Sequence, residues 1–148
     1  RLGCNCTPYL MEVNATSSSH HALARELAAA SAVLLKNDNE PTGSGLPTLP
    51  LRRGQVVAVV GTACDQHPEV AAMLANWVSA SYYTVGGSGR VIATKYVSVL
   101  EGLRDVSGLQ LQVSVQNDDP DEAERAMQGA DVVVACGGGT TSESFDRD

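Results

Sequence analysis

The chain of 148 residues is long enough for one domain with a hydrophobic core, and 43% of its residues are hydrophobic, as in ordinary globular proteins. Its 17 acidic residues against 10 basic ones give a net charge of −7, and the only adjacent basic pair is Arg52–Arg53, which argues against a nucleic-acid-binding groove. No apolar run approaches the ~20 residues that cross a bilayer, and the start of the chain lacks the apolar core of a signal peptide, so we expect any export signal upstream.

The N-terminal third is predicted to hold one helix between two irregular segments. Residues 1–17 have the polar character of an interdomain linker. Ser18 and Ser19 can cap a helix over residues 20–35, where Ala and Leu are strong helix formers and apolar side chains recur at helical spacing. Residues 38–54 contain prolines and glycines throughout, which predicts a loop.

From residue 55 the sequence alternates strand and helix patterns. The last predicted strand, residues 131–136, is a short β-branched apolar run, which predicts burial on both faces. The other strands are predicted over 55–60 and 109–115 with an extended segment at 82–85, and helices over 68–77, 97–106 and 120–128. This alternation predicts an α/β fold with a mostly parallel open sheet flanked by helices. So short a sheet would leave a long unpaired edge, so we expect it to be incomplete.

The segment after the last predicted strand carries the main candidate for chemistry. Gly137–Gly139 are followed by Glu143 and then by Asp146, Arg147 and Asp148. Ligands of open α/β sheets bind just outside the carboxyl ends of the strands, so this acidic loop falls where a site is expected. A glutamate beside other carboxylates in a cleft has a raised pKa and can donate a proton near neutral pH. Spacing alone nevertheless favours the simpler alternative, a solvated loop acid without a role.

Cysteines and sequons leave the cellular compartment open. The C-x-C pair at Cys4–Cys6 lacks zinc or redox spacing. Cys64 and Cys136 stand near the ends of predicted strands, and we expect buried free thiols there, with no disulfide pairing fixed by the sequence. Two N-x-[ST] triplets, at Asn5 and Asn14, are compatible with glycosylation in the secretory pathway and also arise by chance.

Histidines and aromatic residues give weak functional signals. His20 and His21 are neighbours in a predicted helix and point apart, so no metal site is predicted from them. Trp77, Tyr82 and Tyr83 are candidates for the core or for the wall of a cleft, and the low aromatic content favours the core.

Several segments, taken in order, carry a resemblance to a known family. They are RLG at 1–3, LARELAAASAVLLKN at 23–37, LPL at 49–51, VAVVGTACD at 57–65, GGSGRV at 86–91, EGL at 101–103 and the stretch 130–147. Together they resemble the second, α/β-sandwich domain of family 3 glycoside hydrolases, which include β-glucosidases. The resemblance implies that residues 18–148 are part of this domain, preceded by a linker.

The resemblance implies a retaining mechanism with two carboxyl groups. The nucleophilic Asp of the family lies in a preceding barrel domain, and no matching segment occurs here. Glu143 matches the acid/base Glu, and the glycine-rich loop implies that Ser88 and Arg90 contact the sugar. The motif departs from the family's G-E-G-Y at Ser142–Phe145, whereas Asp146–Arg147 match its D-R pair.

The expected partners are therefore a β-glycoside substrate and a barrel domain that carries the nucleophile, with no cofactor, nucleic acid or membrane span. The chain alone is expected to be inactive. One alternative is a non-catalytic carbohydrate-binding or interaction module that uses the glycine-rich loops and Tyr82–Tyr83 as a sugar platform. Another is a nucleotide-binding domain, although Gly86–Gly89 lacks the G-x-G-x-x-G spacing.

Overall fold

The computed structural model describes residues 12, 14, 16–38, 45–93 and 95–144. The chain forms two units, Arg1–Pro47 and Thr48–Asp148, which are treated separately below. The RLG segment, the Cys4–Cys6 pair, the sequon at Asn5 and the acidic residues after Ser144 lie outside the described residues. The linker boundary predicted at residue 17 stays a prediction.

The first unit contains one described helix, α2, over Ser18–Ala30. Its N-cap is Ser17, whose hydroxyl accepts a hydrogen bond from the backbone N–H of His20, so the predicted caps at Ser18 and Ser19 were wrong. The helix also ends five residues before the predicted position 35. There the Ser31 hydroxyl donates to the Ala28 carbonyl oxygen, a local bond that competes with helix continuation. At 13 residues α2 is the longest described helix, and none in the described part of the chain is long and apolar enough to span a membrane.

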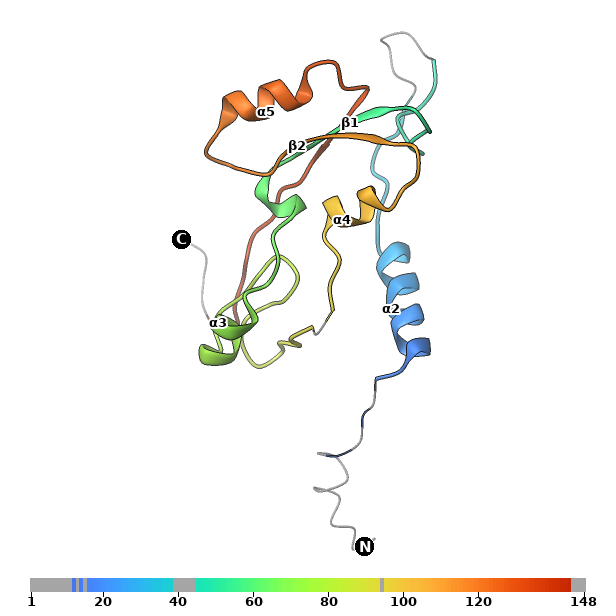
Figure 1. Ribbon diagram of the computed structural model, residues 1–148. Coiled ribbons are helices and arrows are strands. Elements are labelled where there is room, and N and C mark those ends of the chain that lie inside the picture. Colours follow the sequence, from blue (N-terminus) through green and yellow to red (C-terminus); the bar gives the residue numbers. More distant parts are fainter. Residues whose placement is uncertain (1–11, 13, 15, 39–44, 94, 145–148) are drawn as a thin grey trace, which may run out of the picture. The chain divides into compact units, whose positions relative to one another are not determined.

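The second unit is built on a parallel sheet (Figure 1). Its strands are β1 (Val56–Val60), β2 (Gln110–Ser114) and β3 (Val132–Ala135), in the order β2-β1-β3. The central strand pairs in parallel with both neighbours, and Val57 lies opposite Leu111 on one side and Val132 on the other. The predicted α/β fold with a mostly parallel, open sheet is confirmed.

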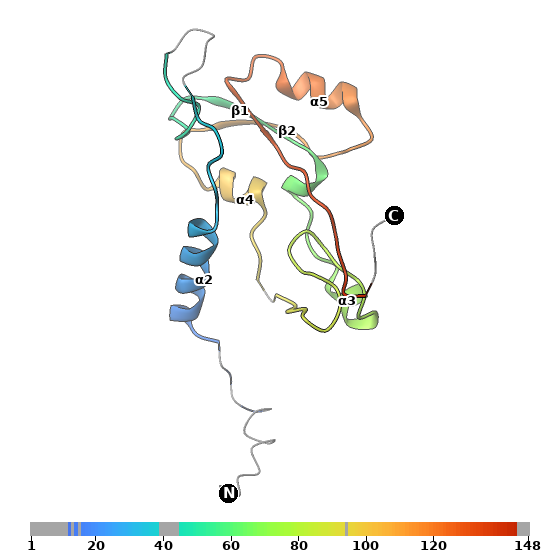
Figure 2. The ribbon, with the colours of Figure 1, turned by 180° about the vertical axis from the view of Figure 1, so that it is seen from behind.

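The hydrophobic core lies between the sheet and helix α4, Val99–Arg104. Val57, Val59 and Leu100 are essentially inaccessible to solvent. Because side chains alternate along a strand, Ala58 points to the opposite face, where α5 (Pro120–Met127) contacts β1 and β2. Both views show α4 and α5 on opposite sides of the sheet (Figures 1 and 2). The core therefore fixes β1 as the buried centre of the unit.

The helices begin where the sequence predicts them to within two residues. Asp119 caps α5 by accepting from the Glu122 N–H at 2.8 Å, with Pro120 in the first turn. A capping box, in which Ser98 and Glu101 bond each other's backbone N–H, starts α4. Helix α3 covers only Val70–Ala75, shorter than the predicted 68–77. Residues 82–84 form a bend, so the extended segment predicted there was wrong.

The predicted burial of the last strand on both faces was also wrong. Within β3, Val132 and Val134 are half-buried against the core, whereas Val133 is 44% exposed. The cause is position: β3 is an edge strand, and on the far face α5 contacts β1 and β2. A β-branched apolar run thus predicted the strand but not its place in the sheet.

Candidate active site

Glu143 lies on the segment that leaves β3 and runs toward α3, the last coloured stretch of the chain in Figure 1. Its side chain is exposed. The segment is held by backbone pairing with Gly86, whose N–H donates to the Thr141 carbonyl at 2.9 Å and whose carbonyl accepts from the Glu143 N–H at 3.2 Å. Gly86 and Ser142 thereby form an isolated parallel β-bridge. The loop after β3 and the loop at Gly86 therefore form one local structure.

Ser88 is hydrogen-bonded to the carboxylate of Glu143. Its backbone N–H donates to Oε2 at 2.9 Å, and its hydroxyl donates to the same oxygen. The hydroxyl and then the N–H of Ser88 hold the pKa of Glu143 below its ordinary value, because both bonds favour the ionised carboxylate. Two of the three predicted site residues are thus brought together.

Arg90, the third predicted site residue, points elsewhere. Its Nη1 donates to the carbonyl oxygens of Met73 at 2.6 Å and Asn76 at 3.1 Å. These carbonyls belong to the C-terminal end of α3, where backbone acceptors lack helical partners and a cation is favourable. The described contacts of Arg90 therefore fix its loop to α3, and no described hydrogen bond joins it to Glu143.

Each predicted glycine-rich loop contains a glycine whose backbone lies too close to a neighbouring side chain for a β-carbon. Gly87 has φ of 97°, in the left-handed region, and a β-carbon there would overlap the side chain of Glu143. A β-carbon on Gly138 would lie 2.6 Å from Cδ1 of Tyr82. These close approaches explain Gly87 and Gly138 by packing within the chain.

The serines that flank Glu143 stand where the family motif has glycine. Ser144 has φ of 68°, a left-handed conformation that glycine adopts without steric cost. The hydroxyl of Ser142 is buried and has no hydrogen-bond partner among the described residues. Serine at both positions therefore lowers the stability of the loop, through the backbone conformation of Ser144 and the unpaired hydroxyl of Ser142. Both residues are direct neighbours of Glu143.

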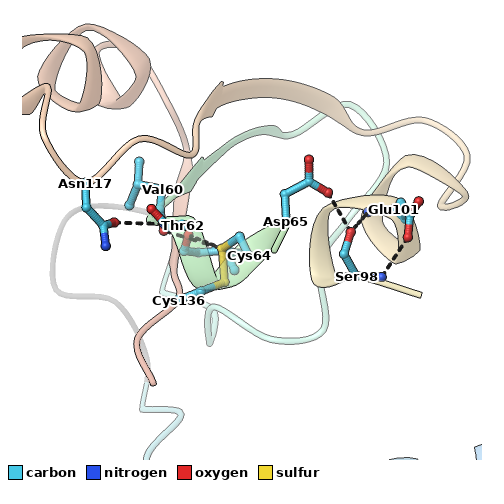
Figure 3. The surroundings of a disulfide bond; sticks show 9 residues. Val60, Thr62, Cys64, Asp65, Ser98, Glu101, Asn117 and Cys136 are labelled. Carbon is cyan, nitrogen blue, oxygen red and sulfur yellow. Dashed lines mark hydrogen bonds between the residues drawn. A yellow bond between two sulfur atoms is a disulfide. The ribbon is translucent and has the colours of Figure 1, made fainter. Parts of the chain in front are cut away.

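A disulfide joins Cys64 and Cys136, so the prediction of buried free thiols was wrong (Figure 3). Cys64 ends the short 3-10 helix Thr62–Cys64 that follows β1, and Cys136 follows β3. The cause is topological: β1 and β3 are adjacent and parallel, so their carboxyl ends meet and the two α-carbons lie 5.1 Å apart. The crosslink fixes the start of the segment that carries Glu143.

A second polar cluster surrounds His67. Its Nε2 lies 3.5 Å from Oε1 of Glu101 and 3.9 Å from Oδ1 of Asp65, and its ring packs edge-on against Tyr96. Ser98 donates to Asp65 at 2.7 Å, which ties this cluster to the start of α4 (Figure 3). No group of three or more metal-binding side chains is arranged to hold a metal ion in the described part of the chain.

Trp77 and Tyr83 do not lie in the core, so the preference for a core position that was drawn from the low aromatic content was wrong for both. Trp77 is 48% exposed and Tyr83 is 38% exposed. Burial of its hydroxyl, followed by the charges of Asp65 and Glu101, raises the pKa of Tyr83 above its ordinary value. Tyr83 stacks on Tyr96, whereas Tyr82 covers Gly138, so the two neighbouring rings are engaged separately.

A pocket of about 330 Å³ opens beside the segment that carries Glu143. Its lining combines polar groups with apolar side chains. It is formed by Gln66, His67, Glu69, Ala72, Met73, Ser79, Ala80, Ser81 and Thr140. Thr140 belongs to the same segment as Glu143, so the pocket adjoins the candidate site.

The sequence predicted Glu143 and Ser88 as site residues but did not indicate three structural connections. These are the Ser88–Glu143 bonds themselves, the capping of α3 by Arg90 and the disulfide. Of these, only the disulfide had a usable signal, since both cysteines follow strands predicted to be parallel.

Comparison with known proteins finds relatives that are named beta-glucosidases. The chain is 33% identical over 141 residues to the periplasmic beta-glucosidase of Salmonella typhimurium, a match that covers 84% of this chain and 18% of that protein. It is 28% identical over 143 residues to thermostable beta-glucosidase B of Acetivibrio thermocellus, covering 87% of this chain and 16% of that protein. No solved structure matches the chain.

The chain therefore spans less than a fifth of the length of these relatives. A family model described as the glycosyl hydrolase family 3 C-terminal domain matches residues 32–148, which is most of the chain. The chain thus belongs to glycoside hydrolase family 3, through the C-terminal domain of that family.

Proposed function

We propose that this chain supplies the acid/base half of the active site of a retaining β-glycosidase, with Glu143 as the proton-transfer residue. The observation that carries this role is an exposed carboxylate on the segment that leaves the carboxyl end of β3, the end of a parallel strand beyond which α/β proteins bind ligands. The relatives are named beta-glucosidases, which supports a β-glucoside as the substrate. The complete enzyme would join this chain to a barrel domain that carries the nucleophile.

The proposed reaction has two proton transfers. In the first step the carboxylate of the barrel domain attacks the anomeric carbon, the bond to the leaving oxygen breaks, and Glu143 gives its proton to that oxygen. In the second step Glu143 takes a proton from water, which attacks the same carbon and releases the nucleophile. Retention requires the two carboxyl groups to lie about 5–5.5 Å apart, a separation that two domains can set across their interface.

Glu143 can take the ionisation state that each of the two steps requires if the nucleophile lies close by. By itself the bond to Ser88 favours the ionised carboxylate, which is the form needed in the second step. A nearby ionised nucleophile would raise the pKa of Glu143 and favour the protonated form for the first step. Esterification removes that charge, so Glu143 becomes a base when a base is required.

Ser88 and Arg90 are proposed to lie beside the bound sugar, since their loop contacts Glu143 directly. Arg90 donates hydrogen bonds to the end of α3 through Nη1 alone. The other N–H groups of its guanidinium can therefore donate to a hydroxyl group of the sugar. The alternative of a binding module with a tyrosine platform is less well supported, because Tyr82 and Tyr83 make separate contacts.

The division of the site between two domains predicts that the 148-residue chain alone does not hydrolyse 4-nitrophenyl β-glucoside. The reason is the missing nucleophile, without which no glycosyl intermediate forms. Release of 4-nitrophenol should equal the buffer rate for the chain and exceed it for the complete enzyme. Catalysis by the chain alone would show that the proposed division is wrong.

The complete enzyme is expected to release its sugar first as the β-anomer, because two displacements restore the starting configuration. Proton NMR of the mixture, recorded before mutarotation, measures this directly. An α-anomer as the first product would instead indicate a single displacement by water and contradict the proposed mechanism.

A further inference from the structure

Three successive residues of the loop Gly86–Arg90 contact Glu143 or its neighbours. Gly86 pairs with the backbone on both sides of Ser142, and Gly87 packs against the Glu143 side chain, where any larger residue would collide. Ser88 then bonds the carboxylate through both its N–H and its hydroxyl. Backbone and side chain of Glu143 are thus held by one loop.

The same loop is itself attached to α3. Arg90 donates to the carbonyls of Met73 and Asn76, and the Gly87 N–H donates to the carbonyl of Trp77 at 2.8 Å. Met73 is almost fully buried, with 2% of its surface exposed. Glu143 is exposed, but the loop that binds it through Ser88 is attached by Arg90 to helix α3. That helix is held in place by the buried side chain of Met73.

The two oxygens of the carboxylate are not equivalent. Both Ser88 bonds go to Oε2, and no hydrogen bond to Oε1 occurs within residues 45–93 and 95–144. An oxygen that already accepts two hydrogen bonds is poorly placed to exchange a proton with a substrate. This leaves Oε1 as the oxygen free to face the glycosidic bond.

We infer that Ser88 is a positioning residue for Glu143, which fixes Oε2 so that Oε1 carries the transferred proton, and that Arg90 holds the loop in place. This role rests on the proposed function, since it presumes that Glu143 is the acid/base. This role goes beyond a contact of Ser88 with the sugar, because such a contact alone would act on substrate affinity rather than on the proton donor.

The test is the pH dependence of kcat/KM in the complete enzyme with Ser88→Ala. The alkaline limb reports the pKa of the proton donor in the free enzyme. Removing a hydrogen bond to the charged form raises that pKa, so the limb should move to higher pH. We also expect kcat for an alkyl β-glucoside to fall roughly tenfold at an almost unchanged KM, because the donor is less well oriented.

Two further variants distinguish the positioning role of the Ser88 hydroxyl from a general effect of removing a serine hydroxyl. Ser88→Thr keeps a hydroxyl and should restore both the alkaline limb and most of kcat. Ser107→Ala removes an exposed hydroxyl from the turn after α4 and should leave the profile unchanged. An unchanged limb in Ser88→Ala, or a raised KM at constant kcat, would overturn the positioning role. Full activity of Glu143→Ala would instead overturn the proposed function, so the two failures are distinguishable.

Discussion

Replacing Glu143 by alanine in the complete enzyme should lower kcat/KM for an alkyl β-glucoside by about 10²–10⁴-fold, the usual contribution of a general acid. An alkoxide is a poor leaving group and depends on the proton that Glu143 supplies. A 2,4-dinitrophenolate leaves without protonation, so formation of the glycosyl intermediate from the corresponding aryl glucoside should hardly change. The measurement is kcat/KM for both substrates in both enzymes.

The matched control is Glu124→Ala. Glu124 is an exposed glutamate on α5, which packs on the sheet against β1 and β2. Its replacement should leave both substrates unaffected. An equal loss for both substrates in Glu143→Ala would indicate structural damage rather than loss of a proton donor, and an unchanged alkyl glucoside rate would place the acid elsewhere.

The second large effect concerns the disulfide between Cys64 and Cys136. The two residues are 72 positions apart, so the crosslink closes a long loop in the unfolded chain. On the chain-entropy account such a loop contributes about 4 kcal/mol to the free energy of unfolding. Replacing both cysteines by alanine should lower that free energy by about this amount in urea denaturation, with a larger m-value because the unfolded chain expands.

The experiment is best made in a chain with Cys4→Ser and Cys6→Ser, so that only one thiol pair remains. Reduction of this chain should reproduce the destabilisation, whereas the same reductant should not affect the double alanine variant. Titration of two free thiols in the denatured, unreduced protein would show that the bond does not form. A stable structural disulfide is typical of proteins outside the reducing cytosol.

Much of the fold was predictable because it is local. The strand β1 is an unbroken apolar run bounded by Gly61, and α5 begins with an aspartate cap and a proline. Such signals depend on neighbours in sequence. The burial of β3 depends on its place at the sheet edge, and the early end of α2 depends on a competing serine bond. These errors come from interactions that local patterns do not encode.

In the candidate site, too, local signals could be read from the sequence, whereas tertiary contacts could not. Glu143 could be found from its position after a strand and from the family resemblance. Its partner Ser88 is 55 residues away, and only the fold shows that the hydroxyl bonds this carboxylate. Arg90 was predicted as a substrate contact because the family resemblance of the loop 86–91 implies that role. The structure shows in addition that Arg90 binds carbonyls at the end of α3, and these partners are set by tertiary packing alone.

The most direct test of the acid/base assignment is azide rescue of Glu143→Ala in the complete enzyme, with 2,4-dinitrophenyl β-glucoside as substrate. Without Glu143 the glycosyl intermediate should accumulate, because water lacks a base to activate it. Azide needs no such base and can enter the space left by the side chain. We predict faster turnover with azide and a β-glucosyl azide product. Turnover that azide does not accelerate, with glucose as the sole product, would contradict the assignment of Glu143.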